Sequence, residues 1–222
     1  YKIDFDFKLF FSEVWREKGG FDVVIGNPPY GVSIKDDYRK IVLKQFDKVP
    51  DFEIYYFFIE LSYNLLRRKG CNSFIIPNSI LFNVYAENYR IKVLDKWEVN
   101  EILDCTNFKF FESAVVRNII YNWSKGASTA KIIIGYRNTY ESNSFIDLIS
   151  RPRIPLSKLE LLTFNQNWGL AFKLNHSTIE IIKRIKSQHK TVNELFDVSQ
   201  GYIPYRRSDL IKTYGKTKGD SI

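Results

Sequence analysis

Four consecutive residues, Asn27-Pro28-Pro29-Tyr30, combine the groups that could bind a planar amine. Neither proline has a backbone N–H, and each pushes the residue before it out of the helical region, so the segment must form a stiff, extended turn. It then presents the Asn27 side-chain oxygen, the Pro28 carbonyl and the Tyr30 ring. Two acceptors can hold the two hydrogens of an exocyclic amino group while the ring stacks on a base. The set therefore suits adenine.

The chemistry that such a set favours is group transfer to the amino nitrogen. N6 of adenine is a weak nucleophile because its lone pair is delocalised into the ring. Hydrogen bonds from both N6 hydrogens to Asn27 and Pro28 would favour a more tetrahedral nitrogen and aim its lone pair at an electrophile. Catalysis of this kind rests on orientation and electrostatics rather than on a strong base. On these four residues alone, an ordinary turn with a buried tyrosine is the simpler interpretation.

The segments around this turn narrow the interpretation. Residues 21–30, Phe-Asp-Val-Val-Ile-Gly-Asn-Pro-Pro-Tyr, resemble the entry strand and signature of type IIG restriction–modification adenine-N6 DNA methyltransferases. Other segments resemble the next helix of that family, its next strand and the segment with its second base-stacking aromatic residue: 53–60 with Gly70, 74–79 and 111–116. The resemblance covers most of residues 1–125, and a weaker one to the start of the family's target-recognition domain runs from Trp168 to Gly215.

The resemblance implies transfer of a methyl group from S-adenosyl-L-methionine to an adenine flipped out of double-stranded DNA. It implies catalytic roles for Asn27, Pro28 and Tyr30, with Tyr30 and Phe111 stacking on the flipped base. Phe110 is the alternative to Phe111, because the run of aromatic residues leaves the register open, and core packing is as plausible for either. Residues beside the cofactor would be Pro29, Tyr55 and Phe58, although core packing suits the last two, which share a helix face.

The elements that must position these residues alternate along the chain. Short apolar runs predict strands, and apolar residues at helical spacing predict helices. The expected elements are a helical or irregular lead-in at 5–18, a buried strand at 21–26, a helix or loop at 35–46, a helix from 50 to 69, a strand at 73–76, a helix at 84–97, a strand at 101–105, and a hairpin of 115–123 with 131–136. The alternation implies an α/β fold with a mostly parallel sheet and an antiparallel edge. This matches the second half of a Rossmann-like methyltransferase sheet.

Domain organisation follows from periodicity and charge. Residues 1–136 are expected to form the methyltransferase domain, 137–164 a linker, and 165–222 the start of a mixed α+β target-recognition domain. The net charge of +8 is uneven: residues 1–150 hold 20 Lys and Arg against 19 Asp and Glu, and residues 151–222 hold 13 against 6. A basic segment fits a module that binds a polyanion, and fits a solvated surface equally well.

The basic segment contains the candidate contacts to DNA phosphates. Apolar residues at helical spacing after Ser177 or Thr178 predict a helix to about Ser187. The candidates lie on this helix and in the loop beyond it: Lys183, Arg184, Lys186, Arg206 and Arg207. Lys and Arg side chains of this kind position DNA rather than read its sequence.

Other features bound the class of protein. No apolar run approaches the ~20 residues that span a bilayer, and no signal peptide is visible. Two cysteines without metal-ligand spacing fit a reducing cytoplasm and no metal site. The family's aromatic-x-Gly-x-Gly loop and the acidic residue for the cofactor ribose have no match upstream of Gly26, and no nuclease constellation is present.

We therefore expect a fragment of a longer protein, because the chain also begins with Tyr and contains no Met. Its partners would be the remainder of its own polypeptide or a companion restriction–modification subunit, and in this family an endonuclease can be attached. The isolated fragment is expected to be inactive. Two other classes fit the same residues: a non-catalytic DNA-binding remnant, or an Asn-Pro-Pro-Tyr methyltransferase acting on RNA or on protein glutamine. The basic segment favours DNA over protein.

Overall fold

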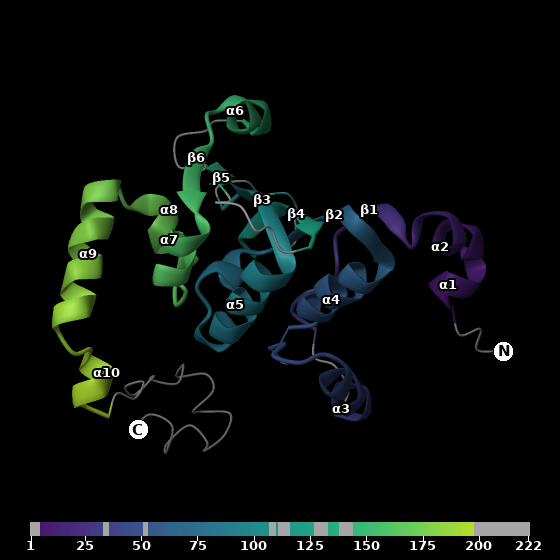
Figure 1. Ribbon diagram of the computed structural model, residues 1–222, viewed down its shortest axis with the longest axis horizontal. Coiled ribbons are helices and arrows are strands. Elements are labelled where there is room, and N and C mark those ends of the chain that lie inside the picture. Colours follow the sequence, from purple (N-terminus) through teal and green to yellow (C-terminus); the bar gives the residue numbers. More distant parts are fainter. Residues whose placement is uncertain are drawn as a thin grey trace, which may run out of the picture. The chain divides into compact units, whose positions relative to one another are not determined.

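The computed structural model describes residues 5–32, 36–50, 53–106, 110, 116–126, 133–137 and 144–197 (Figure 1). The chain divides into two compact units, Tyr1–His176 and Ser177–Ile222. Three of the predicted site residues, Phe111, Arg206 and Arg207, lie outside the described residues.

A mixed sheet forms the centre of the first unit. Its strands are β1 (Phe21–Gly26), β2 (Leu66–Pro77), β3 (Trp97–Asp104), β4 (Asn118–Lys125), β5 (Ile133–Arg137) and β6 (Ile154–Ser157), in the order β1-β2-β4-β3-β5-β6. Strands β1, β2, β3 and β5 run in one direction, and β4 and β6 run in the other. The predicted α/β class is confirmed, but the sheet is mixed rather than mostly parallel, because three of its five strand pairs are antiparallel.

Short helices connect and flank these strands. In the first unit they are α1 (Phe7–Phe10), α2 (Ser12–Lys18), α3 (Asp36–Gln45), α4 (Tyr55–Leu65), α5 (Glu87–Lys96), α6 (Phe145–Ser150), α7 (Lys158–Thr163) and α8 (Trp168–Lys173), with 3-10 turns η1 (Asn78–Leu81) and η2 (Val84–Ala86). The chain continues through α9 (His176–Gln188) into the second unit, which also contains α10 (Val192–Leu195). Helix α9 begins at His176, just before the predicted caps Ser177 and Thr178.

The main core lies where α4 and α5 pack side by side on one face of the sheet (Figure 1). Alternate residues of β2 and β4 are buried there because successive strand side chains point to opposite faces. Aromatic contacts join the layers: Tyr63 on α4 lies 4.9 Å from Trp97 on β3 between ring centroids, and Trp97 lies 6.1 Å from Trp123 on β4. This rigid base supports the carboxyl ends of the strands.

The opposite face of the sheet is covered unevenly. Leu148 on α6 packs against Leu103 and Cys105 at the end of β3. At β1, by contrast, Val23 is 58% exposed and Ile25 is 79% exposed. The predicted strand has the predicted bounds, but it is not the buried strand we expected. It forms an edge of the described sheet, and no described element covers Val23 and Ile25 on that face.

The predicted hairpin is wrong. Strands β4 and β5 both form, but β4 lies between β2 and β3, and β5 pairs with β3 and β6. One edge of β4 is therefore occupied by β2 and the other by β3, the strand that precedes it in the chain. The antiparallel edge strand is β6, which comes from the segment 137–164 that we expected to be a linker. That segment also contains α6 and α7.

The helix predicted from 50 to 69 is also corrected. Helix α4 ends at Leu65, and β2 begins at the next residue. Arg67 then donates to the Asp22 carboxylate on β1 at 2.5 Å. A Cβ at Gly70 would lie 2.8 Å from the carbonyl oxygen of Phe21. This glycine therefore serves the close approach of two strands, rather than the helix end that its position after three basic residues suggested.

Candidate active site

The site candidates gather at one edge of the sheet. Because β1, β2 and β3 run in the same direction, their carboxyl ends meet there, and this is where open α/β sheets bind ligands. Asn27 follows β1, Asn78 follows β2 and Thr106 follows β3. Sequence reasoning found only the first of these three. A polar residue within two positions of a strand end was the signal that could have found the other two.

The Asn-Pro-Pro-Tyr turn has the form that its prolines require. Strand β1 ends at Gly26, and residues 27–30 have no regular secondary structure. Pro28 is buried, Tyr30 is half-buried, and Asn27 and Pro29 are exposed. The buried proline fixes the turn to the protein while the Asn27 amide remains accessible to a ligand.

An open, mostly apolar hollow of about 260 Å³ lies between this turn, β1 and α4. The turn contributes Asn27, Pro28 and Pro29, and α4 contributes Phe58. The other lining residues are Phe7, Val24, Ile25, Gly26, Leu61, Ser62, Leu65 and Phe74. The structure thus brings together two predicted catalytic residues and two residues predicted to lie beside the cofactor.

Tyr55 lies elsewhere. It is 0% exposed, whereas Phe58 on the same helix is 36% exposed. Its ring stacks on Tyr56 with centroids 4.3 Å apart, and burial raises the pKa of Tyr55 well above that of an ordinary tyrosine. Tyr55 therefore anchors the start of α4 in the core instead of facing the hollow. Its predicted place beside the cofactor does not follow from this geometry.

A chain of hydrogen bonds joins the ends of β2 and β3. The Asn78 side chain donates to Thr106 Oγ1 at 3.1 Å, and Thr106 Oγ1 donates to Asp104 Oδ1 at 2.5 Å. The Thr106 backbone N–H also donates to Asp104 Oδ1, at 3.0 Å. These contacts fix Thr106 at the point where the chain leaves β3. Phe110, the alternative to Phe111, is 37% exposed and meets the Phe145 ring edge-on at 6.0 Å.

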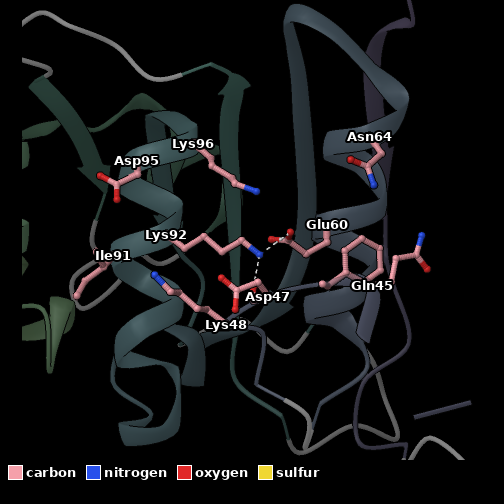
Figure 2. Close-up of a pocket in the computed structure, with 10 residues that line it drawn as sticks. Gln45, Asp47, Lys48, Glu60, Asn64, Ile91, Lys92, Asp95 and Lys96 are labelled. Atoms are coloured by element: carbon pink, nitrogen blue, oxygen red, sulfur yellow. Dashed lines mark hydrogen bonds and ion pairs between the residues drawn. The ribbon is translucent and has the colours of Figure 1, made fainter. Parts of the chain in front are cut away.

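A second hollow, of about 380 Å³, opens between α4, α5 and the end of α3 (Figure 2). At its floor Lys92 Nζ donates to Glu60 Oε2 at 2.8 Å and to the Asp47 carbonyl at 2.5 Å. Both charged side chains are less than one tenth exposed. Because these opposite charges satisfy each other, we interpret this ion pair as a link between the two helices.

Among the predicted DNA contacts, three lie on α9. Lys183 forms an ion pair with Glu180 at 2.9 Å, and Arg184 and Lys186 are exposed. In the described ranges, no group of three or more His, Cys, Asp or Glu side chains could hold a metal ion. None of the helices described is long and apolar enough to cross a membrane.

The sheet order and the turn at its carboxyl edge agree with the fold class expected from the sequence, a Rossmann-like methyltransferase sheet. Residues 2–111 match the Eco57I restriction-modification methylase family. This segment, just under half of the chain, is therefore similar to restriction–modification methylases.

Two curated relatives illustrate the match. The chain is 36% identical over 116 residues to a protein of Methanocaldococcus jannaschii described as a type II restriction enzyme and methyltransferase. This match covers 52% of the present chain and 10% of the relative. The chain is also 32% identical over 110 residues to the type II methyltransferase M.BstVI of Geobacillus stearothermophilus. This second match covers 48% of the present chain and 20% of the relative. The chain therefore matches only a small part of each relative's length.

Solved structures agree on the fold. The type IIG restriction endonuclease BpuSI matches with a TM-score of 0.52 and 16% identity over 76% of this chain and 23% of its own. A modification subunit of a type I restriction enzyme from Vibrio vulnificus matches with a TM-score of 0.50 and 15% identity, over 63% of this chain and 34% of its own.

Proposed function

We propose that this chain is part of a DNA adenine-N6 methyltransferase of a restriction–modification system, with S-adenosyl-L-methionine as methyl donor. The observation that carries the proposal is the accessible Asn27 amide, held beside the buried Pro28 at the carboxyl edge of the sheet. The match of residues 2–111 to the restriction–modification methylases supports DNA as the substrate.

In this proposal the turn acts on the adenine amino group. The Asn27 side-chain oxygen and the Pro28 carbonyl accept the two N6 hydrogens and orient the nitrogen lone pair. When bound, S-adenosyl-L-methionine supplies a methyl group on a positively charged sulfur. The methylated amine then loses its extra proton to water, so the site needs no strong base. Orientation and electrostatic stabilisation account for the catalysis.

The base reaches this turn by leaving the duplex, which costs a few kcal/mol. Tyr30 is half-buried, so part of the residue remains available for stacking on the base. Stacking of a base on an aromatic side chain contributes ~1–3 kcal/mol, enough to offset much of the cost of flipping. A second aromatic residue, Phe111, would lie on the other side of the base.

The residues present fit one part of the cofactor. Pro29 and Phe58 line an apolar hollow that can face an adenine ring. Apart from Asn27, the polar side chain in that lining is Ser62, which already donates to the Ile59 carbonyl at 2.7 Å. The described lining therefore offers little for the ribose and the methionine group.

We therefore propose that the chain works as part of a longer enzyme, completed by the rest of its polypeptide or by a companion subunit. The exposed Val23 and Ile25 on the edge strand β1 support this, because an uncovered apolar strand edge usually pairs with further structure. The isolated chain would then bind the cofactor weakly and transfer no methyl group.

The test is Asn27→Ala in the full-length protein that contains this chain. Loss of one positioned acceptor should lower the rate of methyl transfer to DNA by about 100–1000-fold. DNA binding should change little, because phosphate contacts dominate affinity. Asn88→Ala, on the exposed side of α5, is the matched control and should keep the wild-type rate. A wild-type rate in Asn27→Ala would refute the assignment.

A further inference from the structure

A hydrogen bond also ties the Asn-Pro-Pro-Tyr turn to the body of the protein. The backbone N–H of Gly31, directly after Tyr30, donates to Glu53 Oε2 at 3.0 Å. Among the described residues, residues 28–32 form this one hydrogen bond. The two prolines cannot donate at all. Beside the packing of the buried Pro28, the hydrogen bond to Glu53 is therefore what fixes the turn beyond β1.

Gly31 is suited to this contact by its backbone. Its φ of 68° lies in the left-handed region, which glycine adopts without strain. A Cβ at this position would meet nothing within 4 Å, so the requirement is conformational rather than steric. The chain bends at Gly31 and directs its N–H to Glu53, two residues before α4.

Glu53 lies next to a fully buried part of the core. It stands two residues before α4, and its carbonyl accepts the Tyr56 N–H at 3.4 Å. Tyr55, Tyr56 and Ile59, in the first turns of α4, are all 0% exposed. Because the Glu53 carboxylate lies beside this buried core, its hydrogen bond fixes the position of the turn relative to the core. Its hydrogen bond is charge-assisted, which makes it stronger than a neutral one.

We propose that Glu53 is a positioning residue for methyl transfer, which holds Asn27 and Tyr30 in place through the Gly31 N–H. This inference rests on the proposed function of the turn. A reactive group displaced by about 1 Å can lose on the order of 100-fold in rate. Glu53 would act without touching the substrate, so its loss should lower the rate constant while leaving affinity for DNA unchanged.

The alternative is a purely structural role, because a carboxylate near a helix N-terminus stabilises the helix. Glu87 provides the matched control. It lies in the first turn of α5, is half-buried like Glu53, and has no contact with the turn among the described residues. Glu53→Ala and Glu87→Ala should cause similar, small shifts in melting temperature. Only the Glu53 variant should change catalysis.

The experiment compares Glu53→Ala, Glu53→Gln and Glu87→Ala in the full-length protein. Single-turnover methyl transfer should slow 10- to 100-fold in Glu53→Ala, with unchanged affinity for DNA. Glu53→Gln keeps an acceptor oxygen and should recover most of the rate. A wild-type rate in Glu53→Ala, or a Glu53→Gln as slow as Glu53→Ala, would overturn the inference. So would a rate loss that matches a loss of folded protein.

A second measurement does not depend on activity. The Gly31 amide hydrogen should exchange slowly with solvent in the wild type and in Glu53→Gln, and quickly in Glu53→Ala. Equal exchange in all three would overturn the inference even if the enzyme is active. If the wild type methylates a cytosine or another acceptor, the proposed function fails, while the ratio of rates and the exchange at Gly31 still decide the role of Glu53.

Discussion

At the scale of single residues, Arg90 on α5 shows how a buried charge can hold a fold together. Its side chain is 0% exposed, and its hydrogen bonds go to backbone carbonyl oxygens. These carbonyls belong to Ile80 at 3.1 Å, Asn83 at 2.9 Å, Asn165 at 2.6 Å and Gln166 at 2.9 Å. The planar guanidinium offers five donors in a fixed fork, which suits four acceptors around one point.

Replacement of this arginine should therefore destabilise the first unit. An ammonium group in Arg90→Lys cannot reach all four carbonyls, and each buried acceptor left without a donor costs about 1–3 kcal/mol. We expect a loss of about 2–4 kcal/mol in the free energy of unfolding, measured by urea denaturation. The exposed Arg68→Lys should change it by less than about 0.5 kcal/mol. Equal stability of the two variants would contradict this role.

The backbone conformation at Asn27 and Tyr30 is also decided by single residues, because it follows from their neighbours in the chain. The prolines between them fix the backbone wherever the turn is placed. The local sequence therefore predicted the turn correctly. The tether to Glu53, 22 residues from Gly31, was missed because nothing in the sequence near either residue signals the other.

At the scale of elements, the Glu60–Lys92 pair links α4 and α5, the two helices that support the site (Figure 2). A buried ion pair gains Coulomb energy but loses hydration, so it adds little net stability compared with apolar residues of the same size. Removal of one partner is different, because it leaves a charge buried without compensation.

A double-mutant cycle should show this asymmetry. Glu60→Leu alone should cost about 3–5 kcal/mol in the free energy of unfolding, because Lys92 keeps only the Asp47 carbonyl. The double variant Glu60→Leu, Lys92→Met should recover most of that loss. Chemical denaturation of the two single variants and the double variant gives the coupling energy. A double variant as unstable as the sum of the single losses would exclude a direct interaction between the two side chains.

At the scale of the whole molecule, the boundary between the units changes how the basic segment should be tested. The carbonyls of Asn165 and Gln166 bind Arg90, so a cut at 165 would damage the first unit. The second unit begins at Ser177. Residues 177–222 contain nine Lys and Arg against five Asp and Glu. This segment can be removed without breaking the Arg90 contacts.

Deletion of residues 177–222 should weaken DNA binding and flatten its salt dependence. Each lost phosphate contact lowers the slope of log affinity against log salt by about 0.9. The pair Arg206→Ala, Arg207→Ala should show part of the effect on DNA of any sequence, since phosphate contacts carry no sequence information. Fluorescence anisotropy at several salt concentrations measures the slope, and circular dichroism checks that the remaining unit is folded. An unchanged slope would mean that the segment serves solubility alone.

The sequence by itself determined the features that depend on neighbouring residues. It predicted the bounds of β1, the extended Asn-Pro-Pro-Tyr turn and the alternation of strands with helices, because proline geometry and hydrophobic periodicity act over a few residues. These are local properties, and the tertiary structure did not change them.

Only the tertiary structure decided what depends on contacts between distant residues. Strand β4 lies between β2 and β3 rather than beside β5, because a strand pairs with the neighbours that bury its side chains, wherever they occur in the chain. Tyr55 is buried while Phe58 faces the hollow, because packing around α4 differs at each position. Ile25 is exposed, because an apolar residue is covered only when another element packs on it. Sequence periodicity shows that a residue could be buried, whereas burial itself requires a partner in space.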